Sequence, residues 1–97
     1  MRVMAVGRLE RFNLIRPRVV ELFGDDDETV ERVARVFHLI ELAWHDCYGE
    51  PSPPEGVVDD ILVCSNGTLE GLIDAALLAV VDWRDVRLAA DHRRSTA

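Results

Sequence analysis

Two histidines and a glutamate recur at helical spacing near the middle of the chain. His38, Glu41 and His45 stand at positions i, i+3 and i+7, so their side chains can converge on one side of a helix. Imidazole and carboxylate groups suit Zn²⁺ or Fe²⁺, and Asp46 or Asp60 could add a ligand. The spacing is neither that of the H-E-x-x-H zinc motif nor that of paired E-x-x-H di-iron motifs. The alternative, which the sequence favours, is a stripe of boundary polar groups in which Glu41 pairs with a histidine or with an arginine from an end segment.

The cysteines have no catalytic partner in the sequence. Cys47 lies two residues after His45, and on a helix such side chains point about 160° apart. Cys47 and Cys64 lack C-x-x-C spacing, so in a reducing compartment we expect buried thiols rather than a disulfide. There is also no glycine-rich phosphate loop. The sequence therefore predicts no catalytic residue and no cofactor, and it favours a protein that is not an enzyme.

An aromatic pair precedes a proline-rich segment. Trp44 and Tyr48 are one helical turn apart, directly before Gly49-Glu50-Pro51-Ser52-Pro53-Pro54. We expect the two rings to stack and to anchor this loop as a rigid corner. Aromatic and proline surfaces also serve as docking sites, so Trp44 and Tyr48 are candidate interface residues as well.

The longest predicted element is a helix over about 27–47, which carries both the polar stripe and the aromatic pair. The acidic run before it supplies an N-cap and negative charge for the helix dipole. One face is apolar at helical spacing and comprises Val30, Val33, Phe37, Ile40, Trp44 and Tyr48. Leu39 and Leu42 stand on nearly the opposite side, which is typical of a helix that is central in a bundle or that serves an oligomer.

The other segments also show helical periodicity. We expect short helices over about 4–13 and from Pro17 to Phe23, a main helix from Pro54 to about Ser65 with an exposed Asp59-Asp60 pair, and a last helix over about 69–91. The last helix should bury a stripe that includes Ile73 and Trp83 and then project beyond the body. The predicted fold is an all-α bundle of three main helices plus one or two short N-terminal ones, in a single domain over 1–97 with a disordered tail at 92–97.

Charge is distributed in three blocks. The net charge is −7, with +3 over residues 1–23, −12 over 24–82 and +2 over 83–97. Basic ends that flank an acidic middle predict that both ends lie against the central helices. The overall field repels phosphate backbones, so nucleic-acid binding is disfavoured.

The sequence also bears on where in the cell the protein is found and on the kind of genome that encodes it. The first residues contain no apolar stretch typical of a secretory signal, and the apolar run from Ala75 to Val81 is too short to span a membrane. We therefore expect a cytoplasmic protein. The basic residues other than histidine are all arginine, which is typical of a high-GC, bacterial genome.

The leading functional hypothesis is an interaction or regulatory module that acts as a homodimer. The apolar fraction is 48%, high for so small a chain, so some apolar side chains are left for a partner. Leu39 and Leu42 are the candidate interface residues, unless the N-terminal helices cover them. The alternative hypothesis is a metal-binding protein or metal-dependent enzyme that uses His38, Glu41 and His45.

Overall fold

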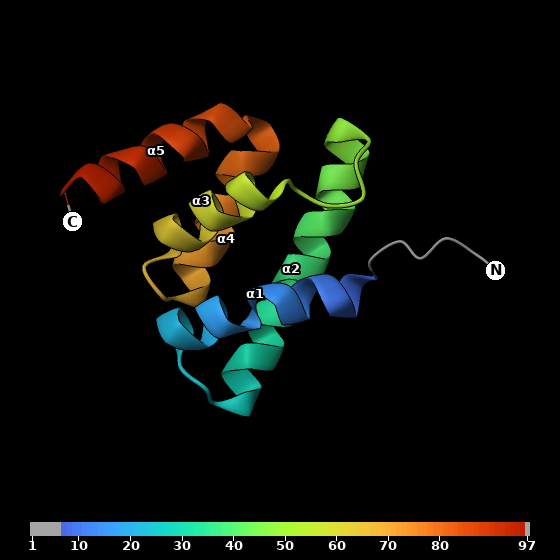
Figure 1. The fold of residues 1–97 in the computed structure, drawn as a ribbon. Helices are drawn as coiled ribbons and strands as arrows, with labels where there is room; N and C mark the ends of the chain where they lie inside the picture. The colour runs from blue at the N-terminus through green and yellow to red at the C-terminus, as the bar shows by residue number, and fades with distance from the viewer. Residues whose placement is uncertain (1–6, 97) are drawn as a thin grey trace.

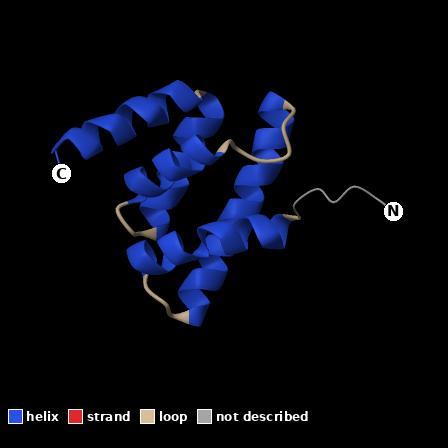
Figure 2. Cartoon of the chain, in the orientation of Figure 1, coloured by secondary structure: helices blue, strands red, loops and turns tan. Residues whose placement is uncertain are grey.

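The computed structural model describes residues 7–96, and within this range all the regular elements are helices (Figures 1 and 2). There are five of them in the described range: α1 (Arg8–Phe23), α2 (Asp27–Tyr48), α3 (Glu55–Ser65), α4 (Leu69–Val81) and α5 (Trp83–Thr96). The predicted all-α class is confirmed. Residues 4–6 of the first predicted helix lie outside the described residues.

The long helix α2 forms the predicted apolar face. Its buried residues are Val30, Val33, Phe37, Ile40 and Trp44, so the periodicity identified the core side correctly. The helix begins at the predicted acidic cap, where Asp26 Oδ2 accepts hydrogen bonds from the backbone N–H and the hydroxyl of Thr29, both at 3.0 Å. It ends at Gly49, which adopts the left-handed conformation with φ 73°, as expected for a residue without a Cβ.

A single helix, α1, replaces the two short N-terminal helices that the sequence predicted. Pro17 lies inside it, where the ring removes one backbone hydrogen bond. Phe12 and Val19, one on each side of Pro17, are both buried in the same core cluster. Tertiary packing on both sides of the proline therefore outweighs its local cost, and Figure 1 shows α1 crossing α2.

Helices α3 and α4 form a tight hairpin, and its turn lies in the gap between the two predicted helices, after Ser65 and before Leu69. Asn66 and Gly67 adopt positive φ angles of 57° and 72°, and the Thr68 hydroxyl accepts the N–H of Gly71 at 3.0 Å to cap α4. The turn also meets α1, because a Cβ at Gly67 would lie 2.4 Å from the carbonyl oxygen of Leu22. Glycine is therefore required here both for its backbone angle and for the close approach.

The predicted last helix breaks in two at Asp82. This residue is extended, with φ −159° and ψ 108°, and its carboxylate accepts hydrogen bonds from the backbone N–H and the side chain of Arg84. Such a side chain caps a new helix instead of continuing the old one, and these bonds lower the pKa of Asp82. Helix α5 consequently packs back against α3 (Figure 1) instead of projecting beyond the body.

The break changes which residues are buried. Ile73 and Trp83, both predicted to lie in the core, are exposed, while Val86 and Ala90 of α5 are buried. Helix α5 also continues to Thr96, so residues 92–96 are helical where the sequence predicted a disordered tail. Among the described residues, no helix is both long enough and apolar enough to cross a bilayer.

Both basic ends contact the acidic middle, as the charge pattern predicted. Arginines of α1 pair with Glu41 of α2 and Asp59 of α3. From the other end, Arg87 and Arg94 of α5 pair with Asp60, and Arg94 also reaches Asp59 at 2.7 Å. The prediction of an exposed Asp59-Asp60 pair is therefore wrong for Asp60, which is 1% exposed. The hydrogen bond between Arg94 and Asp60 raises the pKa of Arg94 above its usual value, and the bonds to Asp59 and Asp91 add smaller contributions.

Candidate functional site

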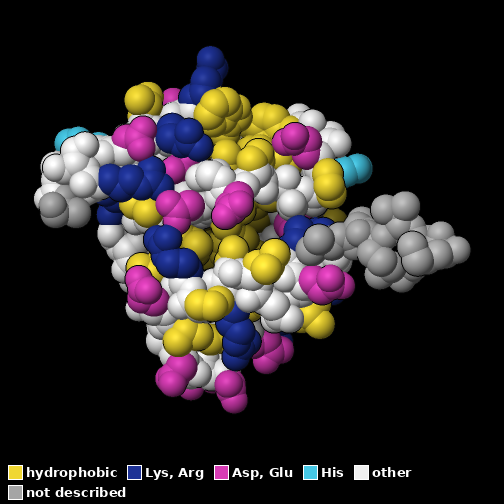
Figure 3. Space-filling view, viewed as in Figure 1, with side chains coloured by type: hydrophobic (Ala, Val, Ile, Leu, Met, Phe, Trp, Pro, Cys, Tyr) yellow, Lys and Arg dark blue, Asp and Glu magenta, His cyan; other side chains and the backbone are white. Residues whose placement is uncertain are grey.

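A groove of about 630 Å³ opens between α1, α2, α3 and the loop over 51–54. We call it the α1–α3 groove. Its apolar lining comes from three helices and includes Phe12, Leu14, Ile15, Phe37, Val58 and Leu62. On the face of the molecule in Figure 3, hydrophobic side chains alternate with basic and acidic ones. Volumes of this size and a lining of this kind are typical of ligand sites.

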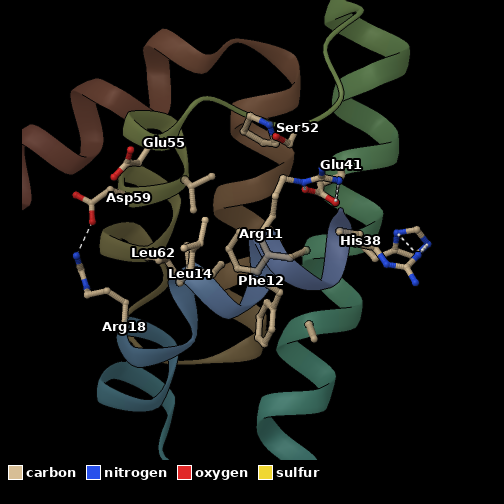
Figure 4. Close-up of a pocket in the computed structure, with 16 residues that line it drawn as sticks. Arg11, Phe12, Leu14, Arg18, His38, Glu41, Ser52, Glu55, Asp59 and Leu62 are labelled. Carbon is tan, nitrogen blue, oxygen red and sulfur yellow. Dashed lines mark hydrogen bonds and ion pairs between the residues drawn. The ribbon is translucent and has the colours of Figure 1, made fainter. Parts of the chain in front are cut away.

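Two ion pairs flank the groove on opposite sides (Figure 4). Arg11 grips Glu41 with both Nε and Nη2, at 2.5 and 3.1 Å from the two carboxylate oxygens, and this hydrogen bonding raises the pKa of Arg11. Arg18 reaches Asp59 from Nη1 alone, at 2.5 Å, while its Nε is buried with no hydrogen-bond partner among the described residues. The Arg11 side of the groove is therefore held more firmly than the Arg18 side.

A third arginine of α1, Arg8, contacts His38. Its Nη1 lies 2.8 Å from Nε2 and 3.0 Å from Nδ1 of the imidazole. A neutral imidazole has one acceptor nitrogen, so only one of the two contacts is a hydrogen bond at a time. The interaction fixes the ring against α1 and leaves the charge of the guanidinium uncompensated.

The polar stripe is therefore divided among different partners. Glu41 pairs with an arginine from an end segment, which confirms the boundary interpretation for this residue. His38 faces Arg8, whereas His45 is exposed and lies 3.9 Å from Asp46. Within residues 7–96, no group of three His, Cys, Asp or Glu side chains is placed to hold a metal ion. The geometry thus does not bring the three predicted ligands together.

The aromatic pair does anchor the loop, but only one of its members reaches the surface. The rings of Trp44 and Tyr48 lie 4.1 Å apart between centroids, and the indole N–H donates to Glu50 of the loop at 2.9 Å. The Tyr48 hydroxyl donates to the carbonyl oxygens of Ala79 and Val80. Trp44 is buried and belongs to the core, so the surface that this pair offers to a partner comes from Tyr48.

The other two candidate interface residues are uncovered. Leu39 is 63% exposed and Leu42 is 52% exposed, although α1 packs against another side of the same helix. Of the two thiols, which are both free, Cys47 is exposed, contrary to the prediction, and Cys64 is half-buried. Burial raises the pKa of the Cys64 thiol.

The α1–α3 groove itself was missed from the sequence, although part of its signal is present. Its wall on α1 comprises Arg8, Arg11, Phe12, Leu14, Ile15 and Arg18. The predicted first helix, over about 4–13, contained only the first three of these residues. Ending that helix before Leu14 and Ile15 hid the rest of the wall.

In the comparisons with known proteins, no family model, no curated protein and no solved structure matches the chain.

Proposed function

We propose that the protein is an interaction module that forms a homodimer through the outward side of α2. We call this surface the α2 flank and define it by Arg35, Leu39, Leu42 and Asp46. The exposure of Leu39 and Leu42 is the observation that carries the proposal. Two large apolar side chains one turn apart lose contact with water when a second copy covers them.

The order of residues along the α2 flank supports an antiparallel arrangement of the two helices. The four residues are spaced i, i+4, i+7 and i+11, which keeps them on one side of a helix. They are also symmetric about the midpoint between residues 40 and 41. In an antiparallel pair centred there, Leu39 lies opposite Leu42 of the second copy, and Arg35 lies opposite Asp46.

Charge favours this orientation over the parallel one. A parallel pair in register would place Arg35 against Arg35 and Asp46 against Asp46, which is repulsive. Within one chain, Arg35 pairs with Glu31 at 2.7 Å in an exposed i, i+4 contact. Such a pair contributes about 0–1 kcal/mol, so it does not prevent Arg35 from turning to a second copy.

Sedimentation of the wild type, four single variants and one double variant tests the proposal. The wild type should sediment as a dimer at about 100 μM, a weak association that fits a small interface. Leu42→Glu should give a monomer with its helicity retained, while Leu88→Glu, an equally drastic change at an exposed site on α5, should leave the dimer intact. Arg35→Glu and Asp46→Arg should each weaken the dimer, and the two together should restore it.

Two results would contradict the proposal. A wild type that is monomeric at about 100 μM, the upper concentration for a weak specific dimer, would rule out the homodimer. A double charge exchange that is as weak as either single variant would rule out the antiparallel register, because the charges would then not face each other.

A further inference from the structure

Arg8 differs from the other two arginines that line the α1–α3 groove. Arg11 and Arg18 each hold a carboxylate, from α2 and α3. In the part of the chain that the structure describes, Arg8 forms no ion pair, and its polar contact is with His38. The groove therefore contains one guanidinium whose charge no carboxylate balances.

The contact with His38 leaves most of this guanidinium able to bind. Only Nη1 of Arg8 faces the imidazole. Nε and Nη2 remain as a planar pair of donors, the arrangement that binds a carboxylate through two parallel hydrogen bonds. His38 thus steadies the side chain without using the donors that an anion needs.

The apolar floor of the groove begins one helical turn from Arg8. Phe12 follows Arg8 at i+4 and Ile15 follows it at i+7. This apolar floor therefore extends roughly 10 Å along α1 from the guanidinium of Arg8. Val58 and Leu62 of α3 form the facing wall, and Figure 4 shows Leu62 across from Phe12 and Leu14. A hydrocarbon chain attached to a carboxylate would lie along this floor and lose its contact with water.

We infer that the α1–α3 groove binds an organic acid with a hydrocarbon body, with its carboxylate on Arg8 and its body on Phe12, Ile15 and Leu62. Of the three carboxylates that line the groove, Glu41 and Asp59 are already paired, so a cationic ligand would have only Glu55 to bind. Glu55, which lies beside Asp59 on the side of the groove away from His38 (Figure 4), is the acid that such a ligand would use. An amine of the same length is therefore the matched competitor.

The probes are octanoate, octanol and octylamine, which share one hydrocarbon chain and differ in charge. Binding is followed by the amide and methyl NMR shifts of the protein. Octanoate should bind with a Kd of about 1 mM or tighter, in the range for a small ligand with one charged anchor. Octanol and octylamine should bind at least about tenfold more weakly, since neither gains a contact with Arg8. The shifts should centre on Ile15, Val58 and Leu62.

Arg8→Gln should weaken octanoate to the level of octanol and leave octanol unchanged. The matched control is Arg16→Gln, which removes an exposed arginine of the same helix that does not line the groove and should change nothing. Val58→Trp, which fills the groove from its α3 wall, should weaken binding of all three probes. Circular dichroism of each variant verifies that it is folded.

Three results would overturn the inference: octanoate bound as tightly by Arg8→Gln as by the wild type, octylamine bound as tightly as octanoate, or shifts centred on α4 and α5. The test is independent of the proposed dimer, because neither Leu39 nor Leu42 lines the groove. A monomeric Leu42→Glu variant should bind octanoate as the wild type does.

Discussion

Trp44 connects three parts of the chain. Its ring is buried in the core and stacks on Tyr48, and its indole N–H holds Glu50 of the loop. Through Tyr48, the same corner is tied to the backbone of α4. The loop over 51–54 forms one edge of the α1–α3 groove, so this aromatic corner also positions the groove.

Replacing Trp44 should be far more costly than replacing an apolar residue on the α2 flank. Trp44→Ala should lower the free energy of unfolding by about 3–5 kcal/mol, because it removes a buried aromatic ring and leaves a cavity. Leu42→Ala, on the same helix, should change it by less than about 0.5 kcal/mol when measured on dilute protein. Denaturation in urea measures both. Similar losses in the free energy of unfolding would contradict the placement of Trp44 in the core and of Leu42 on the exposed α2 flank.

The two thiols should react at very different rates. The thiolate is the reactive form, so the raised pKa of Cys64 leaves less of it ionised at a given pH, and its partial burial limits access. At pH about 8, close to the ordinary thiol pKa, iodoacetamide should therefore label exposed Cys47 before Cys64, as followed by mass spectrometry of peptides. In denaturant the rates should converge. Faster labelling of Cys64 in the native protein would contradict its placement.

At the scale of helices, the sequence was sufficient wherever one side chain or one backbone angle decides the outcome. The acidic cap of α2 and the end of α3 near Ser65 were predicted because each depends on residues that are neighbours in the sequence. The continuity of α1 through Pro17 and the break at Asp82 were not. The continuity of α1 depends on what the two halves of the helix pack against. The break at Asp82 is an exception, because its capping carboxylate is a local signal that the helical spacing of the apolar residues hid.

The turn between α3 and α4 should tolerate a side chain less well than a comparable turn elsewhere. Gly67 and Gly49 have nearly equal φ angles of 72° and 73°, so replacement by alanine has a similar backbone cost, about 1 kcal/mol, at each. Only at Gly67 would the new Cβ meet the carbonyl of Leu22, whereas nothing lies within 4 Å at Gly49. Gly67→Ala should therefore lower the melting temperature clearly more than Gly49→Ala. Equal decreases in the melting temperature would mean that α1 moves away and makes room for the new Cβ at Gly67.

Prediction of the candidate site succeeded only in part, for the same physical reason. Charge and spacing predicted that Glu41 would pair with a histidine or with an end-segment arginine, and the structure shows the arginine. The α1–α3 groove did not, because its walls come from segments about forty residues apart, as the Arg18–Asp59 contact illustrates. The sequence allowed Leu39 and Leu42 to be either exposed or covered by the N-terminal helices, because only the placement of α1 decides between the two.

At the scale of the whole molecule, acidic residues of the middle block form ion pairs with arginines from both the N-terminal and the C-terminal helix. Asp59 contacts Arg18 of α1 and Arg94 of α5, while Asp60 lies buried between Arg87 and Arg94. Neighbouring carboxylates on α3 thus reach helices from both ends of the chain. The basic ends therefore compensate in space a part of the negative charge of the middle block, and the molecule keeps a net charge of −7.

The two carboxylates should differ in their effect on stability. Asp60→Ala leaves two arginines without their buried partner, and should cost about 3 kcal/mol, at the lower end for a broken buried pair because both cations are partly hydrated. Asp59→Ala, at a half-exposed site, should cost about 1 kcal/mol or less. In hydrogen-exchange experiments on Asp60→Ala, the backbone amides of α5 should lose protection before those of the other helices. Unchanged protection there would show that apolar packing alone holds α5.

The distance in sequence between Asp60 and its partners has a consequence for synthesis on the ribosome. Asp60 and Arg87 are 27 residues apart, so at about 5–20 residues per second the carboxylate leaves the ribosome one to several seconds before its counter-ion. Until then, closing the core around α3 would bury a lone negative charge. We therefore expect Asp60 to stay hydrated in the nascent hairpin of α3 and α4, and this part of the core to close only after α5 has been translated.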